Sequence, residues 1–132
     1  MTLKVTHLEG GEFQQSRAFS PAIVTQGGRT VWLSGQTTTT DLEGRDISWN
    51  FEAQVRACYA LMDRTLQRAG GSLASLVYTT TFILDPRHGD RLVDLRKEAF
   101  PHGNYPCSAL ITVAGFARPG ILVEIQGIGV VP

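Results

Sequence analysis

The strongest pattern in the 132-residue sequence is a stripe of apolar residues at helical spacing between residues 50 and 69. Its members recur in steps of three and four and therefore share one face of a helix: Phe51, Val55, Cys58, Met62, Leu66 and Ala69. Asn50 can accept hydrogen bonds from the first free amides, and Gly70-Gly71 can adopt the left-handed conformation that ends a helix. The sequence therefore predicts one long helix with a single apolar face.

Segments rich in β-branched and aromatic residues lie on both sides of this helix and predict strands. They cover residues 22–25, 30–34, 76–84, 108–114 and 121–131. A second helix is expected from about Gly89 to Phe100, after Asp85-Pro86 ends the strand before it. Residues 37–46 are polar and rich in turn formers, which indicates a surface loop.

The order of these elements, ββ-α-β-α-ββ, predicts a single α+β domain over residues 1–132, with a mixed β-sheet and two helices packed on one face. Each terminal pair of strands is expected to form a hairpin, the first one through the turn Gly27-Gly28. Several strands carry apolar residues on both faces. The uncovered face of the sheet is therefore expected to be buried against other subunits of a closed, symmetric oligomer.

Composition excludes several classes of function. Hydrophobic residues make up 42% and charged residues 18% of the chain, which is typical of a folded domain. Lys plus Arg equals Asp plus Glu at 12 each, so neither nucleic acid nor an anionic membrane is an expected partner. The two cysteines form no CxxC pair and no His cluster occurs, which predicts neither a metal site nor a disulfide framework.

The chain also lacks the apolar core of a signal peptide and any run approaching the ~20 apolar residues that span a bilayer. A soluble, cytoplasmic protein is the expectation.

Five segments, taken in order, carry a resemblance to a known family. They are the strand 31–36 ending in Ser-Gly-Gln, the helix 51–71 ending in Gly, the strand 80–85, Pro106 before the next strand, and the acidic closing strand 123–126. Together they resemble the Rid/YjgF family of enamine/imine deaminases, formerly called endoribonuclease L-PSP. The resemblance implies a chorismate-mutase-like homotrimer with small-molecule pockets between subunits, and hydrolysis of reactive enamines and imines without a cofactor.

The resemblance also implies candidate site residues. In the best-studied branch of the family, an Arg in the strand after the Pro binds the substrate carboxylate, and a Glu in the last strand positions the attacking water. Glu124 matches this Glu. Ser108 stands where the Arg is expected, and Pro21 is followed by Ala22 instead of an aromatic residue. The chain therefore resembles a divergent branch that lacks the usual pocket arginine.

Glu124 is the predicted catalytic residue, because a carboxylate in a semi-dry pocket can hold a water molecule and accept its proton. Its alternative role is that of a structural partner for an arginine. Ser34 ends a strand, where its hydroxyl can either bind the substrate or cap the strand end. Cys107 and Ser108 are expected to line the substrate pocket. A nucleophilic Cys107 is less favoured, because only His102 is nearby as a base.

Arg96 falls inside the apolar stripe of the second helix, which an idle arginine rarely does. Three roles are open. Arg96 can extend along the helix to solvent, pair with a carboxylate such as Glu124, or bind the substrate in place of the missing arginine.

Two functions are therefore carried forward: an imine deaminase that uses Glu124, and a non-catalytic or regulatory trimer that binds a small molecule. An endoribonuclease ranks below both, because the balanced charge does not predict a basic groove.

Overall fold

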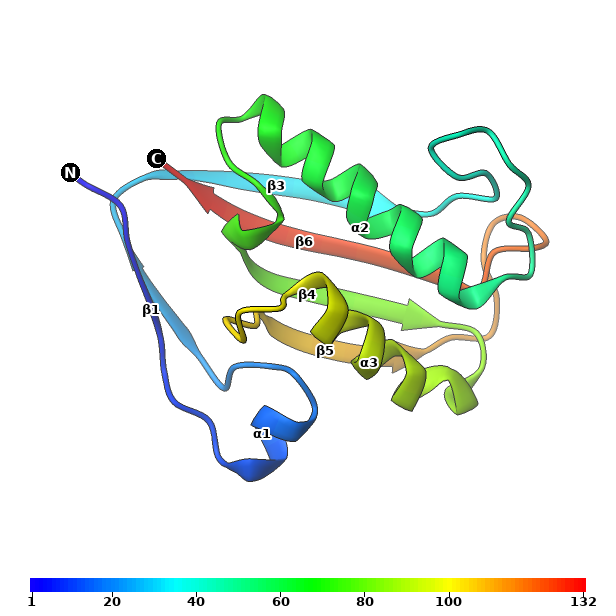
Figure 1. Cartoon of the computed structure of the whole chain (residues 1–132), viewed down its shortest axis with the longest axis horizontal. Helices are drawn as coiled ribbons and strands as arrows, with labels where there is room; N and C mark the ends of the chain where they lie inside the picture. Colours follow the sequence, from blue (N-terminus) through cyan, green and yellow to red (C-terminus); the bar gives the residue numbers. More distant parts are fainter.

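The computed structural model describes all 132 residues, and its centre is a four-stranded mixed sheet (Figure 1). The strand order is β3-β6-β4-β5. Strands β3 (Arg29–Gln36) and β4 (Leu76–Ile83) both run antiparallel to β6 (Val123–Val131), and β5 (Cys107–Thr112) runs parallel to β4. The predicted α+β class and mixed sheet are confirmed.

Two helices, α2 (Phe51–Arg68) and α3 (Gly89–Ala99), cover the same face of this sheet (Figure 1). The Asn50 side chain caps α2 as predicted, by accepting a hydrogen bond of 3.1 Å from the backbone N–H of Ala53. Short 3-10 turns, η1 (Leu73–Ser75) and η2 (Pro86–His88), precede β4 and α3. No helix is both long and apolar enough to cross a membrane.

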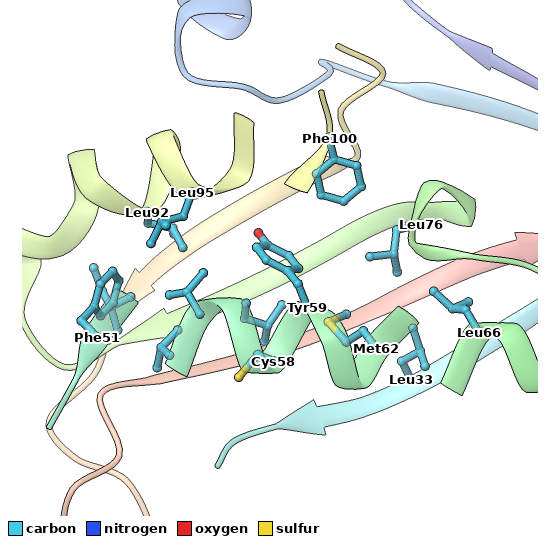
Figure 2. Packing of buried hydrophobic residues seen from close by; sticks show 14 of the residues in the cluster. Leu33, Phe51, Cys58, Tyr59, Met62, Leu66, Leu76, Leu92, Leu95 and Phe100 are labelled. Carbon is cyan, nitrogen blue, oxygen red and sulfur yellow. The ribbon is translucent and has the colours of Figure 1, made fainter. Parts of the chain in front are cut away.

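The core lies between these helices and the sheet (Figure 2). The apolar stripe of α2 supplies much of it, and β6 supplies alternate residues: Val123, Ile125 and Val131. Met62 and Leu66 are fully buried, and each contributes roughly 1.5–3 kcal/mol of hydrophobic stabilisation to folding. Burial of one face by α2 and α3 leaves the other face of the sheet open.

The N-terminal region forms a separate two-stranded antiparallel ribbon, in which β1 (Lys4–His7) pairs with β2 (Ile23–Gln26). A five-residue helix, α1 (Glu12–Ser16), lies between its strands along the chain. Neither β1 nor α1 was predicted, because these segments are short and have no clear periodicity.

Both predicted hairpins are wrong. Gly27 and Gly28 have positive φ values of +70° and +71°, but they join the ribbon to the main sheet instead of pairing β2 with β3. The last two strands do not pair either, because β6 inserts between β3 and β4 while β5 pairs with β4. Local turn signals do not encode this pairing between distant segments.

The open face of the sheet carries large apolar side chains, as the sequence predicts. Trp32 on β3, Tyr78 on β4 and Ile111 on β5 are 76%, 37% and 44% exposed. This arrangement leaves a mostly apolar surface without cover in the single chain.

Candidate functional site

Glu124 lies on the open face of the sheet, near one end of β6. Its neighbours Val123 and Ile125 are fully buried under the helices, so the alternation of a strand directs Glu124 to the opposite side. Within the sheet it is paired with Phe82 of β4. The chain contains no ion pair to Glu124, so the alternative role as a structural partner for an arginine is wrong within one subunit.

The carboxylate of Glu124 packs against the backbone of Gly35 in β3. A Cβ atom placed on Gly35 would lie only 2.7 Å from Glu124 Oε2 and 2.8 Å from its Cδ. Only a glycine leaves room for the carboxylate in this position. The Ser-Gly-Gln motif of the sequence therefore has a steric role that its residue types alone did not reveal.

An irregularity in β3 brings Ser34 to the same end of the sheet. Leu33 pairs with Gly127 and Gln36 pairs with Ile125, so β3 has one extra residue between these pairs. Such bulges re-aim side chains and are frequent next to active sites. Ser34 is exposed and directly precedes Gly35 within the bulge. The structure thus brings Ser34 and Glu124 into one region.

Cys107 and Ser108 lie elsewhere in the single chain. Cys107 is level with Tyr78 in β4, whereas Glu124 is level with Phe82, which is about 13 Å further along the strand. Ser108 is level with the buried Thr79, and its own Oγ is buried without a hydrogen-bond partner in the protein. One subunit therefore does not join these two residues to Glu124.

The thiol of Cys107 shows no sign of activation. Partial burial is the main influence on it and raises its pKa above the usual value. A raised pKa reduces the thiolate fraction that a nucleophile needs, so the structure offers no support for a nucleophilic Cys107.

Arg96 of α3 lies on the helix side of the sheet and is 3% exposed. Its Nη1 donates to the backbone carbonyls of Arg17 and Ala18, both at 3.3 Å. Ala18 has a φ of +60°, an uncommon value for a residue with a Cβ. The hydrogen bonds from Arg96 therefore stabilise a tight turn after α1. The prediction that Arg96 reaches solvent is wrong, because the residue is buried. The prediction that Arg96 pairs with Glu124 of its own chain is also wrong, because α3 and Glu124 lie on opposite faces of the sheet.

Two residues of α2 that contact the backbone near Glu124 were not among the candidates from the sequence. Gln54 is fully buried and hydrogen-bonds to Leu122, two residues before Glu124 in sequence. Cys58, predicted only as a core residue, places its Sγ 3.2 Å from the carbonyl oxygen of Gln36. The sequence did contain a signal for Gln54, because it lies at the edge of an apolar stripe, where a buried amide needs hydrogen-bond partners.

The larger hollows of the single chain do not contain Glu124. One of about 490 Å³ lies beside the N-terminal ribbon and is lined by His7, Phe19 and Tyr105 among others. A smaller one of about 220 Å³ lies on the open face over Trp32, Tyr78 and Ile128.

The sequence matches the family model described as endoribonuclease L-PSP over residues 11–131. The solved structure of YyfB from Yersinia pestis, a Rid family protein of unknown function, aligns with a TM-score of 0.83 over 99% of this chain and 100% of its own, at 22% identity. At that identity the similarity establishes the fold alone.

Rv2704 from Mycobacterium tuberculosis, a member of the YjgF/YER057c/UK114 family, is 26% identical and aligns with a TM-score of 0.67 over 97% of this chain and 100% of its own. The Rid family protein YyfA from Yersinia pestis aligns with a TM-score of 0.71 over 97% of this chain and 100% of its own, at 24% identity. Curated proteins give no significant match.

Proposed function

Because this chain belongs to the Rid/YjgF family, we propose that it hydrolyses a small reactive imine, or the enamine in equilibrium with it, to a carbonyl compound and ammonia. The observation that carries the proposal is the setting of Glu124. Its half-buried carboxylate has no cationic partner and packs against a glycine in a bulged strand on an open face. A structural carboxylate would normally have a partner in such a place.

The chemistry needs one carboxylate and one water molecule. Glu124 accepts a proton from the water as its oxygen bonds to the electrophilic carbon, and the C=N electron pair moves to nitrogen. Protonated Glu124 then returns this proton to the nitrogen. The resulting carbinolamine loses ammonia as the C–N bond breaks, the C=O bond forms and the hydroxyl proton passes to the departing nitrogen. Ser34 hydrogen-bonds to the substrate beside Glu124. No oxidant, reductant or cofactor enters this balance.

The proposed pocket lies between subunits of a homotrimer. Glu124 and the Cys107-Ser108 segment are apart in one chain, so a pocket that uses both needs a second copy. The exposed Trp32 and Tyr78 supply apolar surface on the open face for such an assembly.

The proposed substrate has no carboxylate next to its C=N bond. Ser108 replaces the arginine that binds this carboxylate in the best-studied branch, and Arg96 donates to backbone carbonyls on the other face of the sheet. Arg96 is therefore not included in the proposed pocket. Loss of a bidentate arginine contact removes several kcal/mol of binding for a carboxylate-bearing substrate.

The second candidate function is a trimer that binds a small molecule without catalysis. The replacement of the pocket arginine by Ser108 and of the aromatic residue after Pro21 by Ala22 favours it. Both changes remove groups that would orient a substrate. The retained Glu124 favours the deaminase.

The test is ammonia release from freshly generated 2-aminoacrylate and from imines without a carboxylate. Glu124→Gln keeps the size of the side chain and removes its basicity, so we expect the rate to fall by about 100-fold or more. Glu12→Gln, an exposed carboxylate on α1, is the matched control and should keep the wild-type rate. Sedimentation of each variant checks that assembly is unchanged.

Equal rates for wild type and Glu124→Gln would exclude Glu124 as the general base. An intact wild-type assembly that releases ammonia from no imine would leave the binding trimer as the better description.

A further inference from the structure

Two buried side chains of α2 hold the backbone just before Glu124 and at the end of the neighbouring strand β3, and we propose that Gln54 and Cys58 are positioning residues for this carboxylate. The inference rests on the proposed function, because it assigns these residues a role at the same site. Both side chains belong to residues with no exposed surface, and they lie one helical turn apart on the same side of α2.

Gln54 forms three hydrogen bonds within the protein. Its Nε2 donates to the carbonyl oxygens of Gly120 at 2.7 Å and Ile47 at 3.0 Å. Its Oε1 accepts a bond of 2.8 Å from the N–H of Leu122. One amide therefore ties the loop before α2 to the loop before β6, and both of its N–H donors have partners.

The contact to Leu122 matters because the start of β6 has weak support on one side. The pairing of β3 with β6 ends at Gln36 and Ile125, so β3 gives no pairing to Val123 or Glu124. On the other side β4 pairs with both of these residues. Gln54 supplies a constraint from the helix layer, two residues before Glu124.

Cys58 constrains β3, one of the two strands that neighbour β6. Its thiol donates to the carbonyl oxygen of Gln36, the last residue of β3 and the first after the bulge at Ser34 and Gly35. Burial, and then the negative charge of Glu124, raise the pKa of Cys58 to about 12, so the thiol keeps its proton at neutral pH and stays a donor. The same side of α2 therefore holds the segment just before Glu124 and the end of the neighbouring strand β3.

This arrangement predicts an effect on turnover more than on binding. A general base must hold water within hydrogen-bond distance of the reacting carbon, and a displacement of 1 Å can lower the rate by about 100-fold. The substrate contacts themselves do not involve Gln54 or Cys58, which are buried beneath the sheet. Removal of either tie should therefore lower kcat and leave KM nearly unchanged.

The first variant is Gln54→Met, which has a similar shape and loses all three hydrogen bonds. We expect kcat to fall by about 10- to 100-fold with KM within about threefold of wild type. Amide hydrogen exchange at residues 122–124 should become faster. The matched control is Asp63→Ala, which removes a 2.8 Å hydrogen bond to the N–H of Leu73 from the other half of α2. It should change neither kcat nor exchange at residues 122–124.

A second pair of variants tests Cys58 and does not depend on the folding of Gln54→Met. Cys58→Ala removes the donor to Gln36 and should lower kcat, whereas Cys58→Ser keeps a hydroxyl donor and should restore most of it. Equal kcat values for the two variants would contradict the role of Cys58.

The proposal is overturned if Gln54→Met and Asp63→Ala change kcat by the same factor relative to wild type. It is also overturned if amide exchange at residues 122–124 in Gln54→Met stays at the wild-type rate. Hydrogen exchange needs no turnover. If the wild-type protein hydrolyses no imine, the proposed function fails, and the exchange rates still decide whether Gln54 fixes the start of β6.

Discussion

At the scale of single residues, the site depends on the absence of a side chain as much as on the presence of one. Glu124 occupies the volume that a Cβ atom at Gly35 would need. The φ of Gly35 is not in the left-handed region, so its backbone conformation is open to alanine. Space, and not backbone freedom, is the reason for this glycine.

Gly35→Ala should therefore displace the carboxylate without unfolding the protein. We expect kcat for imine hydrolysis to fall by about 10-fold or more, with little change in the melting temperature. Gly115→Ala is the control, because a Cβ atom there meets nothing within 4 Å. Steady-state kinetics and thermal melts of both variants give the comparison, and equal kcat values would show that Glu124 tolerates the added methyl group.

At the scale of elements, α2 organises both the core and the site, while the 3-10 turn η2, which leads into α3, begins at a charged cap. Asp85 accepts hydrogen bonds from the backbone N–H of Arg87 at 2.9 Å and from the Arg87 guanidinium at 2.7 Å. These contacts lower the pKa of Asp85 from 3.8 to about 2. A carboxylate with a lowered pKa in the folded state stabilises that state above its unfolded pKa.

This contribution should disappear as pH falls from about 4 towards 2, where the folded-state carboxylate is protonated. We expect Asp85→Asn to melt at a lower temperature than wild type at pH 7. The difference between the two melting temperatures should narrow as the pH falls from about 4 towards 2. Asp94→Asn is the control, because it also removes one negative charge, in this case from α3, but removes no backbone hydrogen bond. Thermal melts at several pH values check the prediction, and a constant difference between Asp85→Asn and wild type would contradict it.

At the scale of the whole molecule, the two faces of the sheet differ sharply. One face is sealed by α2 and α3 (Figure 1). The other face presents Trp32, Tyr78 and Ile111, and it also carries Glu124. An exposed apolar surface of this kind marks an interaction site. The proposed homotrimer would bury it and complete the pocket at the same time.

Trp32→Glu should therefore weaken the assembly, because a charge in a buried interface is costly. We expect sedimentation velocity to show smaller species than for wild type, together with loss of imine hydrolysis. Phe13→Glu changes an aromatic residue of α1 that is 67% exposed and should leave the size unchanged. An unchanged sedimentation coefficient for Trp32→Glu would place the interface elsewhere.

The sequence predicts local elements well because their signals are local. The stripe from Phe51 to Ala69 specifies α2 almost to its ends. The pairing of strands depends on distant segments, and the turn at Gly27-Gly28 could not show that β2 joins β1. The site follows the same division. Glu124 is a prediction from its strand motif. The space at Gly35 and the contacts of Arg96, whose partners lie 78 and 79 residues away, exist only in three dimensions.

The central place of β6 has a consequence for synthesis of the protein. Ribosomes release the chain from the N-terminus, so β3, α2, β4 and α3 all emerge before residues 123–131. Until then the inner edges of β3 and β4 have unpaired backbone groups, and the apolar side of α2 has no complete sheet beneath it. Open strand edges and exposed apolar surface are the features of nascent chains that aggregate and that chaperones bind. Translation speed and chaperone supply should therefore influence how much of this protein accumulates in a cell.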